Sequence, residues 1–418
     1  MKYYIYIILI LLGNPIQAVG EAGAIFLLIP TSPISNGMGR NGVSNISENN
    51  YGVHDNPANK YFPKHGKSIN SFYTHAPWLS NLAPDIFIDH YATHIGFSVN
   101  KKFKLSLGIE RFSLDLGQQS GMDEQGNPIL PIHVYMFSDA TNIAIQYNEK
   151  IVSIPIKFNL GITRKHVLQD FGSSQNEEII GNWWEQDNLI SEFYISEDIL
   201  YDYGILFEST ILNSNLNNPN NNLKLKLING YSISNLGDYI SFGVDYQSDP
   251  TPRCVRMGLG LQFIINAKNE KLLSWNVTNS VQDLLIRTNI ENGQSVHYYQ
   301  RGLGDIKILE HIIFNFPSSQ VEVSNGHEIN YKNKIAFRFG NYIDIDGKVE
   351  HSSYGLSFSA LKLIDRFLIK RGLNNLIDIN FHLAYYKADP GHPVANTLFY
   401  SSSFAIKNID KIINKIID

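Results

Sequence analysis

Apolar residues occupy every second position through several stretches of this chain. Because residues two apart in a strand share a face, such alternation predicts a β-strand with one apolar and one polar face. The pattern recurs over residues 255–265 and, less regularly, over residues 223–233 and 377–385. In the clearest stretch the apolar positions are Val152, Ile154, Ile156, Phe158, Leu160 and Ile162.

A change of phase interrupts the alternation between residues 103 and 116. Apolar residues hold the odd positions from Phe103 to Ile109, and the pattern slips near Arg111. Phe112 and Leu114 then continue it on the even positions. A single extra residue in a strand shifts the two faces in this way, so the slip predicts a β-bulge.

Turn residues separate the predicted strands. Asp346-Gly347 and Asn292-Gly293 each lie between two strand-like segments, and both dipeptides favour two-residue hairpin turns. The Asn-rich segment 213–222 is predicted as a loop, and residues 117–138 and 170–198 as long loops. Short turns that alternate with long loops are typical of outer-membrane barrels.

Periodicity alone fits either a soluble sandwich with an apolar core or a membrane barrel with an apolar exterior. The best segments approach the 9–11 residues that cross a tilted bilayer. Aromatic residues flank apolar stretches or lie toward segment ends, as an interfacial girdle would: Tyr231, Tyr354, Tyr385, Tyr386, Phe399 and Tyr400. The fold class predicted here is therefore all-β, a transmembrane antiparallel β-barrel of about 14 strands in the bacterial outer membrane.

The first residues indicate export. Residues 1–18 combine a basic start, an apolar run too short to span a bilayer, and Ala18 before a predicted cleavage site. An uncleaved anchor is the alternative. We expect a signal peptide at 1–18 and a mature chain from about Val19.

Composition narrows the remaining classes. Charged residues make up 17% of the chain and aromatic residues 12%, which argues against disorder. A net charge of -5 without basic runs argues against nucleic-acid binding. The single cysteine excludes a disulfide framework and a cysteine-based zinc site.

Residues 20–58 resemble a known family in their order and spacing. An Ala-Gly precedes Phe26-Leu27, a Gly-Met-Gly follows at Gly37-Met38-Gly39, and Asn56-Pro57-Ala58 completes the segment. This opening is similar to that of the PorV/PorQ family, which belongs among the fatty-acid-transporter-like (FadL-like) outer-membrane barrels. His54-Asp55 before the Asn-Pro-Ala and Asn59-Lys60 after it depart from the family pattern.

The resemblance gives the chain a domain plan. Residues 19–62 are expected to form an N-terminal hatch and residues 63–407 the transmembrane barrel. Residues 408–418 place isoleucines at helical spacing opposite lysines, which predicts a short C-terminal amphipathic helix.

Candidate chemistry is sparse. The sequence has no Gly-x-Ser-x-Gly nucleophile elbow and no His-Glu-x-x-His metal motif. His90 and His94 share one face of a predicted strand, but a metal site needs a third ligand. We expect no enzyme activity, no cofactor and no metal.

Two functions remain open. If the resemblance extends to function, the barrel contacts outer-membrane lipid and carries or docks exported proteins, with other subunits, in a type IX-like secretion system. Trp183 and Trp184 would then be candidates for partner docking, although a membrane girdle is an equal explanation. The alternative is a FadL-like channel for hydrophobic small molecules, with an apolar site between Phe26, Leu27 and the wall.

Overall fold

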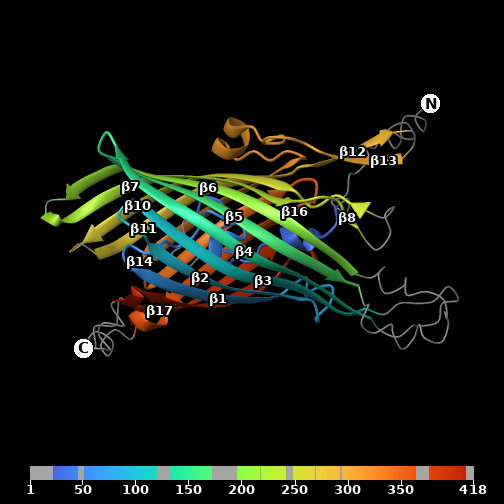
Figure 1. Cartoon of the computed structure of the whole chain (residues 1–418), viewed down its shortest axis with the longest axis horizontal. Coiled ribbons are helices and arrows are strands. Elements are labelled where there is room, and N and C mark those ends of the chain that lie inside the picture. The colour runs from blue at the N-terminus through green and yellow to red at the C-terminus, as the bar shows by residue number, and fades with distance from the viewer. Residues whose placement is uncertain are drawn as a thin grey trace.

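The alternating segments form strands that close into one antiparallel barrel. In the computed structural model, fourteen strands pair in the order β1-β18-β17-β16-β15-β14-β11-β10-β7-β6-β5-β4-β3-β2, and β2 pairs with β1 (Figure 1). The predicted fold class and strand number are therefore confirmed. The structure describes residues 22–45, 51–119, 132–171, 195–216, 218–241, 248–268, 270–291, 294–363 and 376–410.

The barrel strands are 10 to 22 residues long. Their bounds are β1 (Lys67–Pro77), β2 (Phe87–Ser98), β3 (Phe103–Gln119), β4 (Ile132–Ile151), β5 (Ile154–Asp170), β6 (Ile195–Leu216), β7 (Asn218–Leu236), β10 (Cys254–Ala267), β11 (Glu270–Leu284), β14 (Val321–Tyr331), β15 (Ile335–Asp344), β16 (Val349–Ser359), β17 (Ile377–Ala388) and β18 (Leu398–Lys407). Two small hairpins lie outside this sheet, β8 (Ile240–Ser241) with β9 (Ser248–Asp249), and β12 (Ile286–Glu291) with β13 (Gln294–Tyr299).

The two ends of the barrel differ in their connections. At one end, the turn rim, residues 152–153 join β4 to β5 and residues 332–334 join β14 to β15. At the other end, the loop rim, residues 237–253 and 285–320 make long connections. Outer-membrane barrels have short turns on the periplasmic side and longer loops outside, so the turn rim faces the periplasm.

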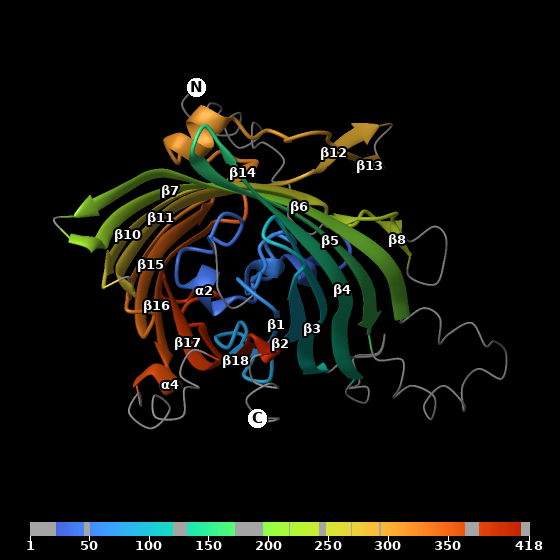
Figure 2. The same ribbon diagram turned by 60° about the vertical axis from the view of Figure 1, so that its left-hand side comes forward.

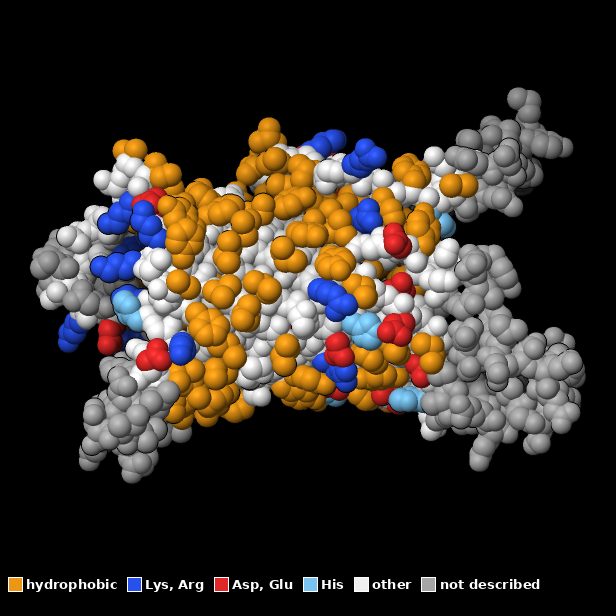
Figure 3. All heavy atoms as spheres, in the orientation of Figure 1, with side chains coloured by type: hydrophobic (Ala, Val, Ile, Leu, Met, Phe, Trp, Pro, Cys, Tyr) orange, Lys and Arg blue, Asp and Glu red, His pale blue; other side chains and the backbone are white. Residues whose placement is uncertain are grey.

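The predicted orientation of the two strand faces is confirmed. On β5, Phe158, Leu160 and Ile162 expose 37%, 38% and 50% of their surface on the outer wall. Asn159 between them and Thr163 after Ile162 are buried on the lumenal side. Figure 3 shows apolar side chains spread over the outside of the barrel. Over residues 156–163 the wall is therefore apolar toward lipid and polar or small toward the lumen.

The β-bulge predicted near Arg111 is wrong. The pairing of β3 with β2 stays in register from Lys104 to Asp115, and the shift in β3 occurs later, between Asp115 and Gln118. Phe112 and Leu114 lie on the lumenal face and are buried. The apolar phase changes there because the lumenal face meets an apolar part of the hatch, described below.

Several predicted loops are shorter than expected. Strand β6 runs to Leu216 and β7 begins at Asn218, so the loop predicted over 213–222 is strand. Amide side chains suit strands that extend beyond the bilayer, and Asn266 Nδ2 donates to Asn222 Oδ1 at 2.6 Å. Strands β3, β4 and β6 likewise reach into the loops predicted over 117–138 and 170–198.

The two hairpin signals have different outcomes. The first hairpin is confirmed, but its turn has four residues, 345–348, instead of the predicted two. The Gly347 N–H donates to Asp344 Oδ1 at 2.9 Å within this turn. Asn292-Gly293 lies outside the described residues, but the flanking strands β12 and β13 pair in antiparallel register.

The long connection 285–320, which we name the strap, folds back over the outer wall (Figure 1). Its buried apolar residues pack on Val281 and Val323 of the wall. They include Ile306, and also Ile312 of the π-helical turn η5 (Ile308–Ile313). Asn279 Nδ2 also donates to the carbonyl of Ile312 at 3.0 Å. This part of the outer wall therefore contacts protein instead of lipid.

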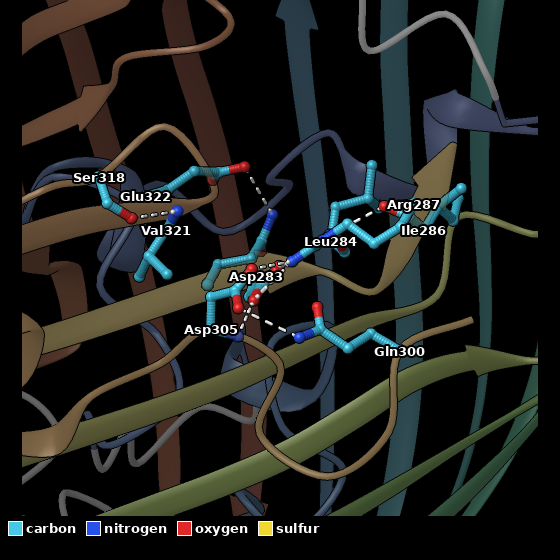
Figure 4. A network of polar contacts seen from close by, with 10 residues as sticks. Asp283, Leu284, Ile286, Arg287, Gln300, Asp305, Ser318, Val321 and Glu322 are labelled. Carbon is cyan, nitrogen blue, oxygen red and sulfur yellow. Dashed lines mark hydrogen bonds and ion pairs between the residues drawn. The ribbon is translucent and has the colours of Figure 1, made fainter. Parts of the chain in front are cut away.

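An ionic network fixes the start of the strap to β11 (Figure 4). Arg287 Nη2 lies 2.8 Å from Asp283 Oδ1 and 2.8 Å from Asp305 Oδ2. The Asp305 N–H donates to Asp283 Oδ2 at 2.6 Å, and Gln300 Nε2 donates to Asp305 Oδ1 at 3.1 Å. The Asp283 side chain at the centre of these bonds is completely buried. The network joins both ends of the β12–β13 hairpin to the end of β11 at the loop rim.

The helical elements are short. They include η2 (Ile25–Leu28), α2 (Pro33–Asn36), η3 (Tyr51–Val53) and α4 (Ala360–Leu363). Within the described ranges, none of the helices has the length and apolar character needed to cross a membrane.

Candidate functional site: the lumenal hatch

The described N-terminal residues, 22–45 and 51–62, lie inside the barrel, as Figure 2 shows for α2 and its flanking segments. We refer to these residues as the hatch. Ser32 caps α2, since its Oγ accepts from the Ser35 N–H at 3.2 Å, and Pro33 occupies the first turn. The helix ends at Asn36, where glycines follow. The hatch thus changes direction within a few residues and contacts several parts of the wall.

The Gly-Met-Gly turn is seated on β14, β15 and β16. Gly39 has a φ of +69°, and a Cβ there would approach the Asn325 carbonyl to 2.8 Å, so both the backbone angle and the space require glycine. Met38 is fully buried, and the Gly39 N–H donates to Ser353 Oγ at 2.7 Å. Gly37 lies against Gly355 of β16.

The Asn-Pro-Ala turn is fixed by the side chain of Asn56. Asn56 Nδ2 donates to the carbonyls of Val43 and Ile205, each at 3.0 Å, and Asn56 Oδ1 accepts from the Ala58 N–H at 2.9 Å. Asn56 is completely buried. One amide therefore closes its own turn, joins it to the preceding hatch turn, and binds it to β6.

Three pairs of wall glycines receive three hatch turns. In each pair the two glycines face each other across neighbouring strands, and a Cβ on any of them would approach hatch atoms to less than 3.0 Å. We name these pairs the glycine seats. They are Gly326–Gly340 under Met38-Gly39, Gly161–Gly204 under residues 56–58, and Gly230–Gly258 under Val43-Ser44.

The glycine seats are hatch contacts that the sequence alone did not single out. Glycines were visible on the polar face of the predicted strands, for example Gly161 and Gly258. Their partners across the sheet depend on strand register, which hydrophobic alternation does not give. The feature of the sequence that indicates such contacts is the recurrence of glycine at lumenal positions of the strands.

Toward the loop rim the hatch forms an apolar lid. Phe26 and Leu27 are 3% and 2% exposed and pack among lumenal residues that include Ile88, Phe112 and Leu114. The Phe26 and Phe112 rings lie 5.7 Å apart. The lid also contains the wall residues Tyr386 and Phe399, so the prediction that these two belong to a membrane girdle is wrong.

Charged hatch residues are buried behind the lid. Burial raises the pKa of Asp55 and lowers the pKa of His54. Burial also lowers the pKa of Lys60 to about 7, and Lys60 Nζ donates to Asn142 Oδ1. The departures from the family pattern, His54-Asp55 and Asn59-Lys60, are therefore interior residues that contact the wall or other parts of the hatch.

Cavities between hatch and wall are small. One, lined in part by Arg40, Asp55 and Arg256, has a volume of about 30 Å³. Another, beside Leu27 and His90, has a volume of about 20 Å³. Each has room for about one water molecule.

The two histidines singled out in the sequence face the lumen and share one carboxylate. His90 Nε2 and His94 Nε2 each lie 3.3 Å from an oxygen of Glu110, and all three side chains are buried. Among the described residues, no group of three or more His, Cys, Asp and Glu is arranged to hold a metal ion. The trio is consistent with a buried hydrogen-bonded cluster.

Eight of the residues predicted for the site are among those described, and the structure does not bring them together at one place. They lie in the hatch in three places: the apolar lid (Phe26, Leu27), the first turn (Gly37, Met38, Gly39) and the second turn (Asn56, Pro57, Ala58). Trp183 and Trp184 lie outside the described residues, as do the predicted signal peptide and residues 411–418 of the predicted C-terminal helix.

Comparison with known proteins gives similarity to solved barrels only. No family model and no curated protein matches the sequence. A TodX deltaS2S3 mutant monoaromatic hydrocarbon channel is 11% identical with a TM-score of 0.46, over 90% of this chain and 98% of that chain. The CymD monoaromatic hydrocarbon channel is 11% identical with a TM-score of 0.40, over 91% and 98%. A Pseudomonas aeruginosa FadL homologue is 9% identical with a TM-score of 0.38, over 91% and 99%.

The fold and the site define the class of this protein. A closed antiparallel barrel with an even number of strands, an apolar exterior and a polar lumen is the architecture of bacterial outer-membrane proteins. The chain is a bacterial outer-membrane β-barrel that contacts lipid, and its N-terminal segment lies inside the lumen.

Proposed function

We propose that this barrel is a sealed, non-enzymatic component that carries or docks exported proteins in a type IX-like secretion system. The observation that carries the proposal is the seating of three hatch turns on three glycine pairs, which suits a permanent plug. The resemblance of residues 20–58 to the PorV/PorQ opening supports the choice of secretion system.

The hatch contacts argue against a plug that leaves during each transport event. Besides the glycine seats, Asn41 Nδ2 donates to the Thr278 carbonyl at 2.9 Å, and Ser232 Oγ donates to the Asp55 carbonyl at 2.7 Å. Each such bond contributes about 1 kcal/mol net, and more is lost when a buried partner stays unsatisfied. Movement of the hatch would break these bonds together, so a docking role needs less rearrangement than conduction.

The test of the proposal is direct binding of an exported protein. The purified barrel in detergent should bind the isolated C-terminal signal domain of a protein exported by the same cell, measured by calorimetry. If Trp183 and Trp184 form the docking surface, changing both to Ala should weaken binding about tenfold or more. Trp275→Ala is the matched control, because Trp275 is 44% exposed on the outer face of β11. Absence of binding by the unmodified barrel would refute the proposal.

A FadL-like channel for hydrophobic small molecules is the second candidate. It is favoured by the apolar lid, where Phe26 and Leu27 occupy the place that an apolar ligand would take. Two results together would select this candidate over the docking role. The barrel would bind a fluorescent fatty acid saturably, with weaker binding when wall residue Phe112 is replaced by a polar side chain. It would also conduct in a planar bilayer.

A further inference from the structure

Below the hatch, the lumen opens to the turn rim as a hollow of about 670 Å³, which we name the vestibule. This volume lies within the range of 300–1,000 Å³ found for ligand sites. Its lining comes from hatch residues such as Lys60 and from inward-facing residues near the turn-rim ends of the strands.

The lining is strongly cationic. Ten Lys and Arg side chains line the vestibule against three carboxylates, although the whole chain carries a net charge of -5. The cations come from the hatch and its exit, from β3, β5, β7, β11 and β15, and from the segments beside β15 and β16: Lys60, Lys64, Lys104, Lys157, Lys224, Lys226, Lys271, Lys334, Arg338 and Lys362.

The three carboxylates are already engaged. Glu208 Oε1 lies 2.9 Å from both Lys157 Nζ and Lys226 Nζ. Arg338 Nη2 lies 2.7 Å from Glu328 Oε2. The third carboxylate, Asp378, lies 3.2 Å from Lys362 Nζ and 2.7 Å from Lys407 Nζ.

Other cations of the lining have no such partner. Lys104, Lys224 and Lys271 make no ion pair within the described part of the chain. Like charges gathered around one hollow repel each other and focus a positive potential into it, so the arrangement favours an anionic occupant.

We propose that the vestibule binds an acidic peptide segment presented from the turn-rim side. The proposal is independent of the docking role above, because it concerns the opposite end of the barrel. Lysine ammonium groups are mobile point charges, which suit carboxylates spaced along a chain better than one planar anion that needs a bidentate arginine. The amide side chain of Gln262, which also lines the vestibule, can hydrogen-bond a peptide backbone.

The main experiment measures binding of a fluorescein-labelled oligoglutamate peptide to the full-length barrel in nanodiscs of zwitterionic lipid. The triple variant Lys104→Gln/Lys224→Gln/Lys271→Gln should weaken binding by roughly tenfold or more. The matched control is Lys101→Gln/Lys150→Gln/Lys268→Gln, which removes three exposed turn-rim lysines outside the vestibule and should change binding by less than about twofold. Heat-modifiable gel mobility verifies that both variants fold.

A second measurement locates the peptide. The one native cysteine, Cys254, is buried, so a maleimide reports selectively on Lys271→Cys, with Lys268→Cys as the control. Bound peptide should slow labelling only at the first position. The proposal would be overturned if the two triple variants weakened binding equally, or if an oligolysine peptide bound equally well. It would also be overturned if citrate competed as strongly as the peptide at matched carboxylate concentration.

Discussion

The seating of the hatch predicts that one methyl group in the wall unseals the lumen. In Gly161→Ala, the new Cβ would lie less than 3.0 Å from the backbone of Pro57 and Ala58. Carbon atoms pack best at about 3.5–4.0 Å, so the hatch turn must retreat by on the order of 1 Å. Backbone cannot rotate away as a flexible side chain can, and overpacking of this kind costs about 1–3 kcal/mol.

The retreat also strains hydrogen bonds of the same turn. Asn159 Nδ2 donates to the Ala58 carbonyl at 3.2 Å, and Asn56 binds the Ile205 carbonyl at 3.0 Å. Loss of one such bond adds about 1 kcal/mol, which brings the total to about 2–4 kcal/mol. This total corresponds to a roughly 30- to 700-fold increase in the population of unseated hatch.

Planar-bilayer recording measures that population as the probability of open-channel events. Gly260→Ala is the matched control, because it adds the same methyl to a lumenal strand position where the nearest neighbour is the Thr278 methyl at 3.1 Å. We expect frequent openings in Gly161→Ala and few in Gly260→Ala. If the two variants conduct equally often, the glycine seats do not hold the hatch.

Three further predictions concern single side chains. Asn56→Ala leaves buried backbone groups without partners and should lower the free energy of unfolding by about 2–4 kcal/mol, measured by urea titration. Phe26→Ala should cost about 3–5 kcal/mol in the same titration, because Phe26 is 3% exposed within the apolar lid. Burial opposes ionisation of Asp305, but hydrogen bonds from Arg287 and Gln300 hold its pKa below the ordinary value. The carboxylate therefore stabilises the strap above the unfolded pKa of about 3.9, and that stability is lost as pH falls. Pepsin should cleave the strap faster at about pH 2 than at about pH 4, and Asp305→Asn should remove most of that difference.

The sequence predicted the barrel because alternation reports the two faces of a strand directly. Phe158, Leu160 and Ile162 point to lipid as expected, and fourteen strands close the sheet. Features that depend on register or on distant segments could not be predicted. The glycine seats need the cross-strand partners of Gly161 and Gly340, and the apolar phase change at Phe112 has its cause in Phe26, on another segment of the chain.

The lumen has two unlike halves, and their order along the barrel restricts what the protein can do. Toward the loop rim, the apolar lid and the glycine seats leave cavities of about 30 and 20 Å³. Toward the turn rim, the vestibule is open and cationic, at about 670 Å³. An anionic segment that enters from the periplasm would meet the buried hatch, and further passage would move its charges from water into apolar surroundings at a cost of several kcal/mol each. The vestibule therefore suits holding a ligand more than passing it, and its occupation would favour the seated hatch by adding contacts that only the seated state offers.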